Sequence, residues 1–333
     1  MPELRKDPVL GRWVVIGTER VRRPADFRAG RPEATTTSCV LCEGNEHETP
    51  PELLAYRDGM HTAPNGPGWQ VRVVPSKFPI LRVEGDPERR GHGLYDVMSG
   101  VGAHEVIVES PRHRDSLTTL ALPAVEQVVR AWRERILDLK RDERIRSVVV
   151  FKKHGLDVGG TREHGYSQLL ATPTPPQRLS DKLHHARAYY DYRERCLLCD
   201  IVRQETEERT RVVHTSEHIL AFAPFASRFP FEVWILPRQH APAFEHASPR
   251  DLTELSSALY TVLHKLDAAL DDPPFNLVLH SAPSGEHESP YCHWHVEIAP
   301  KLTPSAGSEW GSGFHVNPMP PEDAARFLRD APA

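Results

Sequence analysis

Two short stretches of the sequence, Cys39-Val-Leu-Cys42 and Cys196-Leu-Leu-Cys199, carry one pattern in two distant places. Neither pair lies in the strand and helix context of a thioredoxin-like redox motif, so each is best interpreted as half of a zinc site. The remaining cysteine, Cys292, has no partner, and the set does not resemble the disulfide framework of a secreted protein.

The chain that follows each cysteine pair repeats the same order of segments. A β-branched stretch comes first, at 105–108 and again at 232–236, and each ends in a histidine, His113 or His240. An amphipathic helix follows, at 125–139 and 252–270, and then a second apolar stretch, at 147–151 and 275–279. The repeat ends at His164 and His293, which lie 51 and 53 residues after the earlier histidines. Such an internal duplication indicates two related units.

The duplication supplies the missing ligands for both cysteine pairs. We predict two zinc sites with four protein ligands each, and closed coordination of this kind is typical of structural zinc. The alternative is that the thiols are small buried side chains and the histidines have packing roles. The predicted ligands are Cys39, Cys42, His113 and His164 in the first half, and Cys196, Cys199, His240 and His293 in the second.

Length and charge restrict the class of protein. The 333 residues suffice for two units, which we place at 1–180 and 181–333. There are 41 basic and 46 acidic residues, so no global positive field favours nucleic acid. No apolar run approaches the roughly 20 residues of a membrane span, and no secretion signal begins the chain. We therefore expect a cytoplasmic protein that binds neither nucleic acid nor membrane.

Ordered motifs along nearly the whole chain resemble those of the galactose-1-phosphate uridylyltransferases and related nucleotide-sugar phosphorylases of the histidine-triad superfamily. The resemblance implies an α+β fold of duplicated histidine-triad-like units with a mostly antiparallel sheet, working as a homodimer whose active site borrows residues from the partner. The motifs include Arg5-Lys-Asp-Pro-Val-Leu-Gly-Arg-Trp-Val14, Lys77-Phe-Pro79, Ser167-Gln-Leu-Leu-Ala-Thr-Pro173, His293-Trp-His-Val-Glu-Ile298 and Gly307-Ser-Glu-Trp-Gly311.

The resemblance also implies a reaction. A nucleoside monophosphate moves from a nucleotide sugar, a UDP-hexose by default, to a sugar 1-phosphate through a covalent nucleotidyl-histidine. Gln168 matches a glutamine that bonds the reacting phosphoryl group. Glu309 matches a hexose-contacting glutamate in a loop, 307–313, that reaches the sugar of the neighbouring subunit. The expected substrate-binding residues are Arg20, Arg23, Ser76, Lys77, Lys153, Gly159, Gly160, Thr161 and Glu309.

The sequence departs from the family at the nucleophile, where Tyr166 replaces the second histidine of the motif. Tyrosine can act as a covalent nucleophile, but with an ordinary pKa near 10 only about one part in a thousand is ionised at pH 7. Arg162 or Lys153 could supply the cation that ionisation requires. Lys153 and Ser76 themselves stand where the family has asparagine, which favours an altered substrate or chemistry.

Several alternatives remain open on the sequence alone. The protein could be a phosphorylase or hydrolase that works by direct displacement, or a non-catalytic nucleotide-binding homologue. Some relatives place another metal on histidines matching His280, His293 and His295, but the carboxylate of that site falls on Lys182 here, so we prefer zinc. His295 is either an acid–base group or a structural one. Surface or packing roles are expected for His47, His104, His154, His184, His185 and His287.

Overall fold

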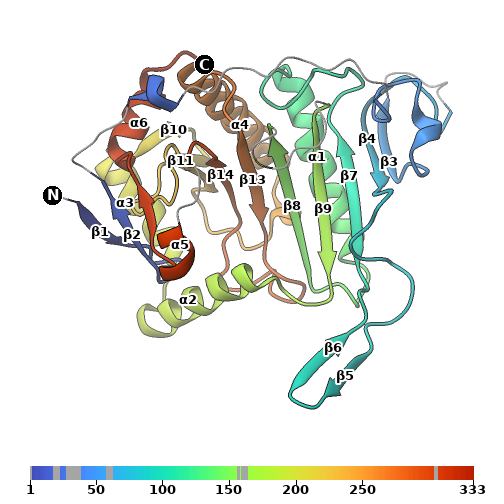
Figure 1. The fold of residues 1–333 in the computed structure, drawn as a ribbon, viewed down its shortest axis with the longest axis horizontal. Helices are drawn as coiled ribbons and strands as arrows, with labels where there is room; N and C mark the ends of the chain where they lie inside the picture. Colours follow the sequence, from blue (N-terminus) through green and yellow to red (C-terminus); the bar gives the residue numbers. More distant parts are fainter. Residues whose placement is uncertain are drawn as a thin grey trace.

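A ten-stranded sheet runs through the whole molecule (Figure 1). The computed structural model describes residues 2–17, 23–27, 39–57, 63–155, 158, 164–303 and 307–333. Every neighbouring pair of strands in this sheet is antiparallel, which confirms the expected α+β class. In spatial order the strands are β10 (Val212–Thr215), β11 (Ile219–Phe222), β12 (Val233–Pro237), β14 (His295–Pro300), β13 (Phe275–His280), β8 (Ser147–His154), β9 (Tyr166–Thr172), β7 (Ala103–Val108), β4 (Trp69–Pro75) and β3 (Leu54–Arg57).

The two repeats meet in the middle of this sheet. Strands β8 and β13 pair antiparallel, with Phe151 opposite Val278 and Lys152 opposite Leu277. The strands of the first half follow on one side and those of the second half on the other, in matching order. Residues at equivalent positions are therefore related by an approximate twofold axis between β8 and β13.

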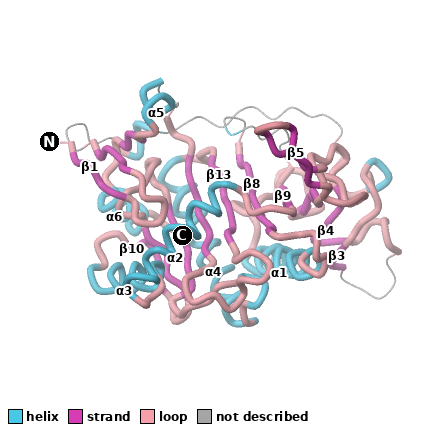
Figure 2. The backbone as a smooth tube through the Cα atoms, turned by 90° about the horizontal axis from the view of Figure 1, so that it is seen from below, coloured by secondary structure: helices cyan, strands magenta, loops and turns pink. Residues whose placement is uncertain are grey.

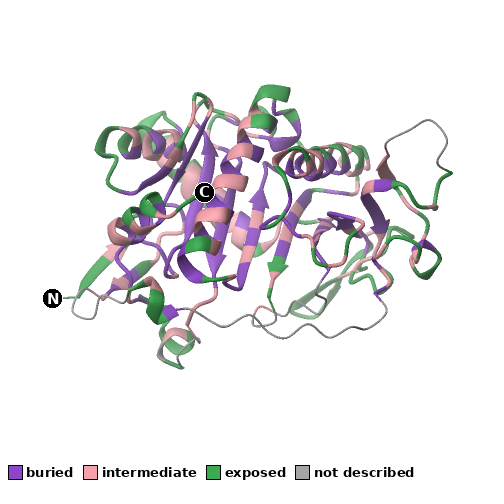
Figure 3. Ribbon diagram, turned by 90° about the horizontal axis from the view of Figure 1, so that it is seen from above, coloured by how far each residue is buried: buried purple, intermediate pink, exposed green. Residues whose placement is uncertain are grey.

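Two helices cover one face of the sheet and contain the predicted amphipathic stretches. They are α1 (Leu122–Leu139) and α4 (Pro249–Leu270), which pack against each other on the same side of the sheet (Figure 2). Helix α4 begins with a capping box, in which the Ser248 hydroxyl accepts from the Asp251 amide and the Asp251 carboxylate accepts from Ser248. Alternate strand residues such as Leu169 and Val296 point into this core, so the middle strands are largely buried (Figure 3).

The opposite face is covered mainly over the second half. There α3 (Leu197–Glu208) packs Leu198 and Val202 against Phe222 of β11 and Trp234 of β12. Other elements near this face are α2 (Gln177–Arg193) and a small sheet of β1 (Glu3–Lys6), β2 (Trp13–Ile16) and β15 (His315–Asn317) (Figure 1). Helix α6 (Pro321–Asp330) instead packs against α4 and β10, in the core on the other face. Short helical segments lie at α5 (Gly307–Ser312), Pro24–Phe27, Glu46–Glu48 and Phe244–His246.

The two outermost strands of the large sheet are short and irregular. Strands β3 and β10 have four residues each. The pairing of β3 with β4 shifts register between Tyr56 and Arg57, and that of β10 with β11 shifts between Val212 and His214. A separate hairpin of β5 (Arg89–His92) and β6 (Tyr95–Met98) projects from the body of the protein (Figure 1). In the described part of the chain, no helix is long and apolar enough to span a membrane.

Candidate functional site

The first set of predicted metal ligands converges in the structure. Cys42 Sγ lies 3.5 Å from His113 Nδ1 and 3.6 Å from His164 Nδ1, and Cys39 Sγ lies 3.7 Å from His164 Nδ1. Zinc bonds of about 2.3 Å to sulfur and about 2.0 Å to nitrogen at tetrahedral angles require sulfur–nitrogen separations of about 3.5 Å. The four side chains therefore fit one tetrahedral metal ion.

The orientation of His164 agrees with a ligand role. Its Nε2–H donates to the carbonyl oxygen of Ser110 at 2.7 Å, which leaves Nδ1 facing the cysteines. Burial lowers the pKa of His164 to about 4, so the ring is neutral and Nδ1 keeps its lone pair. A backbone acceptor on the distal nitrogen is the usual device for orienting a metal-binding imidazole.

The second set converges in the same way. Cys199 Sγ lies 3.4 Å from both His240 Nδ1 and His293 Nδ1, and Cys196 Sγ lies 3.8 Å from His293 Nδ1. The distal nitrogens donate to backbone carbonyls, from His293 to Pro237 at 3.0 Å and from His240 to Ser289 at 3.2 Å. Both halves of the protein can thus hold a metal ion with two thiolates and two imidazoles.

The first Cys/His cluster lies at the start of β9, the strand that carries the predicted catalytic residues. His164 precedes β9, where Tyr166 and Gln168 share the face that is not covered by α1. Tyr166 is partly buried against the apolar cluster of Cys39, Trp69 and Val108. No described residue forms a hydrogen bond with its hydroxyl group.

Three more predicted residues lie on or beside this open face. Lys153 is exposed on β8, two residues after Phe151, which pairs with Gln168. Ser76 follows β4 and donates its backbone N–H to the carbonyl of His104 at 2.8 Å. Lys77 is exposed, and its ammonium group lies 3.4 Å from the carbonyl of Glu48.

The remaining predicted residues are not gathered at this face. Arg23 is exposed near Asp26, with no contact to Tyr166 or Gln168 among the described residues. Glu309 lies on α5, beside the small sheet at the other end of the molecule, where its carboxylate accepts from the Val316 amide at 2.9 Å (Figures 1 and 2). Arg20, Gly159, Gly160, Thr161 and Arg162 lie outside the described residues.

One residue beside Tyr166 and Gln168 was assigned to surface or packing roles from the sequence. His104 on β7 is partly buried, and its Nε2 lies 2.9 Å from Oε1 of Gln168. A surface or packing role is therefore an incomplete description, because the imidazole bonds a predicted catalytic side chain. Strand alternation alone could not find this contact, since it depends on the register between β7 and β9.

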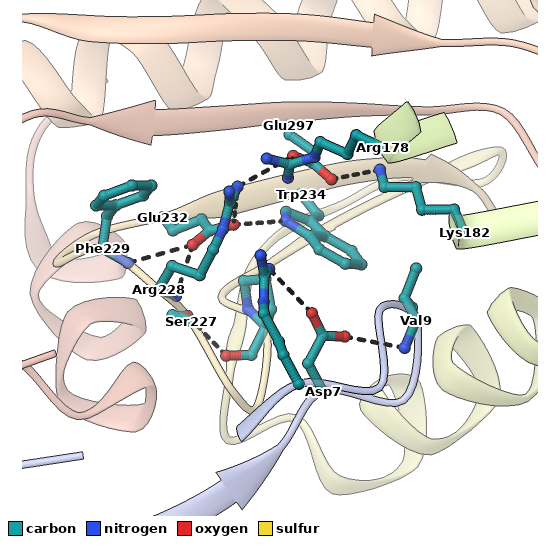
Figure 4. Close-up of polar contacts among 12 residues, drawn as sticks. Asp7, Val9, Arg178, Lys182, Ser227, Arg228, Phe229, Glu232, Trp234 and Glu297 are labelled. Atoms are coloured by element: carbon teal, nitrogen blue, oxygen red, sulfur yellow. Dashed lines mark hydrogen bonds and ion pairs between the residues drawn. The ribbon is translucent and has the colours of Figure 1, made fainter. Parts of the chain in front are cut away.

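The equivalent face of the second half is filled. Positions matching Tyr166 and Gln168 are His295 and Glu297 on β14, and both are buried with His280. The ammonium group of Lys182, from α2, lies 2.5 Å from Glu297 Oε1 (Figure 4). It also lies 2.6 Å from His295 Nε2. His280, His295 and Glu297 form a ligand-like group, but the lysine supplies the positive charge at its centre.

The hydrogen bonds of His295 leave it no free acceptor. Its Nδ1–H donates to the carbonyl of His293 at 3.1 Å, and Nε2 accepts from Lys182. Burial lowers the pKa of Lys182 to about 8 and that of His295 to about 4. At neutral pH the lysine is therefore charged and the imidazole neutral, which is the arrangement this hydrogen bond needs.

Further ion pairs surround Glu297. Arg178 contacts its Oε2 at 2.5 Å, and Arg228 bridges the same oxygen and Glu232 at 3.3 and 3.4 Å (Figure 4). Burial would raise the pKa of Glu297, but the charge of Lys182 holds it well below the usual range. The second half thus contains a charged core rather than an open site.

Replacing Lys182 tests this view. Lys182→Met should destabilise the protein by roughly 3 kcal/mol, because it leaves the carboxylate of Glu297 buried with only the arginines beside it. Arg178→Met is the matched control, since Arg178 binds the same carboxylate from a side chain that is 38% exposed. It should cost at most about 1 kcal/mol. Denaturant unfolding measures both, and equal losses would contradict a central role for Lys182.

Comparisons with known proteins agree with this arrangement of two halves. The family model for the N-terminal domain of galactose-1-phosphate uridyl transferase matches residues 1–176, and that for the C-terminal domain matches residues 182–307. An ADP-glucose phosphorylase of Arabidopsis thaliana is 34% identical, over 99% of this chain and 93% of its own. A galactose-1-phosphate uridylyltransferase of Thermotoga maritima is 29% identical, over 99% of this chain and 98% of its own. The crystal structure of an Arabidopsis thaliana ADP-glucose phosphorylase with bound ADP-glucose superposes with a TM-score of 0.84, at 33% identity over 100% and 99% of the chains.

Proposed function

The chain belongs to the galactose-1-phosphate uridyl transferase family, and on that basis we propose that it transfers a nucleoside monophosphate from a nucleotide sugar to a phosphate acceptor. The observation that carries the proposal is the contrast between the two halves. Tyr166 and Gln168 line an accessible face of β9, while the equivalent His295 and Glu297 are buried under Lys182. The reaction therefore belongs to the first half.

The names of the relatives suggest two pairs of nucleotide-sugar donor and phosphate acceptor. The 34% identical relative is named for phosphorolysis of ADP-glucose, in which inorganic phosphate is the acceptor and ADP and glucose 1-phosphate are the products. The 29% identical relative is named for uridylyl transfer, in which galactose 1-phosphate is the acceptor. Both reactions break the bond between the α-phosphorus and the oxygen that bridges it to the β-phosphate, so one site serves either.

We assign the nucleophile to Tyr166. Its hydroxyl group gives its proton to solvent, and the phenolate oxygen attacks the α-phosphorus. The sugar 1-phosphate leaves with the bridging oxygen, and a tyrosyl nucleotide remains. The acceptor phosphate then attacks the same phosphorus and releases the tyrosine oxygen. Lys153 is the described cation on the neighbouring strand that is suited to stabilise the phenolate, and Gln168 donates to the phosphoryl oxygens.

Mass spectrometry of the intact protein tests the covalent step. Incubation with ADP-glucose or UDP-glucose in the absence of acceptor should add one nucleoside monophosphate, and peptide mapping should locate it on Tyr166. Tyr166→Phe should form no adduct and should lose transfer activity, because the attacking oxygen is absent. Retention of an appreciable rate by Tyr166→Phe would instead establish direct displacement.

We also propose that both Cys/His clusters hold structural zinc. The thiolate and imidazole ligands, four to a site with no position left for water, are typical of structural zinc sites. Their bonds connect the segment of each cysteine pair to the start of β9 or β14 and so hold the active face in place.

Metal analysis gives a direct count for each site. The purified protein should contain two zinc ions per chain, and Cys42→Ser and Cys199→Ser should each remove one. A chelator should lower the melting temperature, since metal binding contributes to folding free energy. Cys292→Ser is the control, because Cys292 is buried outside both clusters, and it should keep both ions. A content of two ions in Cys42→Ser would refute the first assignment.

A homodimer would bring Glu309 to the site. Within one chain α5 and β9 lie apart, so a contact of Glu309 with the hexose requires the partner subunit (Figure 1). Coexpression of Tyr166→Phe with Glu309→Ala, each inactive or strongly impaired alone, should then restore activity through mixed dimers that contain one intact site. Absence of recovery in isolated mixed dimers would mean that both residues act within one chain or that Glu309 has no role.

A further inference from the structure

We propose that His104 is a positioning residue that fixes the orientation of the Gln168 amide, and with it the donor presented to the transferring phosphoryl group. This inference rests on the proposed function, in which Gln168 touches that group. His104 lies on β7, and its ring reaches diagonally to Gln168 on β9 from the open face of the first half.

The tautomer of His104 follows from its backbone neighbour. The N–H of Ile80 points at Nδ1 of the imidazole, at 3.4 Å. A backbone N–H can only donate, so Nδ1 accepts and the single proton of the neutral ring is on Nε2. The long distance makes this a weak bond, but an Nδ1–H tautomer would bring two donors face to face.

The tautomer in turn decides how Gln168 is oriented. The Nε2–H of His104 donates across 2.9 Å, so the atom of Gln168 that faces it is the amide oxygen. The amide nitrogen then points elsewhere, and no described residue accepts a hydrogen bond from it. Its two hydrogens are available for the oxygens of a phosphoryl group, where a preorganised donor is most effective.

His104 also connects Gln168 to the loop that follows β4. The carbonyl of His104 accepts from the Ser76 amide at 2.8 Å, and its ring accepts from Ile80, so both ends of the 76–80 loop are attached to one residue. This loop contains the Lys77-Phe-Pro79 motif. His104 therefore links this loop to the amide of Gln168, and the stronger of its two loop contacts uses the backbone carbonyl, which any residue at this position keeps.

The second half has lost this arrangement. The position equivalent to His104 is Glu232, and the position equivalent to Gln168 is Glu297. Two carboxylates cannot bond each other as acceptors, and Arg228 bridges them instead. Glu297 is an acceptor without a donor group, so it cannot take the role that we propose for Gln168.

A double-mutant cycle separates positioning from packing. His104→Phe keeps the ring volume without the N–H, and it should lower kcat by about 10- to 100-fold with little change in KM for the nucleotide sugar. In a Gln168→Ala background the same substitution should cause almost no further loss, because there is no amide left to orient. His104→Gln, which returns an amide N–H near the position of Nε2, should recover part of the rate. Full additivity, or failure of His104→Gln to exceed His104→Phe, would overturn the proposal.

A second measurement tests the His104 tautomer without requiring catalytic activity. In nitrogen-15 NMR spectra of the histidine rings, the resonance that disappears in His104→Phe belongs to His104. At neutral pH its chemical shift should be that of the Nε2–H tautomer. The Gln168→Ala variant should shift that resonance, because it deletes the acceptor. An Nδ1–H tautomer would overturn the positioning role. If the predicted tautomer and shift are present but no nucleotide sugar reacts, the proposed function fails while the His104–Gln168 geometry stands.

Discussion

The pairing of β8 with β13 is the constraint on which the rest of the molecule depends. It joins the two repeats into one sheet and relates every later strand to a counterpart across an approximate twofold axis. Because the register is fixed there, β9 and β14 present Tyr166 and His295 at matching places. The Cys/His cluster at the beginning of each of these strands then holds matching loops against the sheet.

The two halves share this framework but differ in whether the face opposite α1 and α4 is covered. In the first, the face opposite α1 remains accessible and carries a tyrosine, an amide and exposed lysines. In the second, α2 and α3 cover the face, and a fully buried lysine binds Glu297 and His295. A buried carboxylate with several cationic partners is costly to assemble and difficult to alter one residue at a time.

Much of the molecule could be predicted from the sequence. The resemblance and the α+β class are confirmed. The cysteine pairs and the repeated order of segments predict eight candidate metal ligands, and the structure brings these residues together in two clusters. The contact of His104 with Gln168 could not be predicted, because it depends on the register between two strands and joins residues 64 positions apart. The burial of Lys182 could not be predicted for a similar reason. The periodicity of a helix does not show which residues of a distant strand its side chains will contact, and Lys182 of α2 contacts His295 and Glu297 of β14. Glu309 is a different case, because the resemblance implies that its loop reaches a neighbouring subunit, and within one chain α5 lies apart from β9.

The irregular outer strands of the large sheet restrict how copies of this protein can meet. An exposed strand edge has unpaired backbone groups that can bond a strand of another chain, and a long, flat edge therefore promotes open-ended aggregation. Here each edge is four residues long and interrupted by a register shift, so its free amide and carbonyl groups do not form an even row. Copies of this protein are therefore poorly suited to join their large sheets edge to edge, and neither end of the large sheet starts an open-ended row of strands.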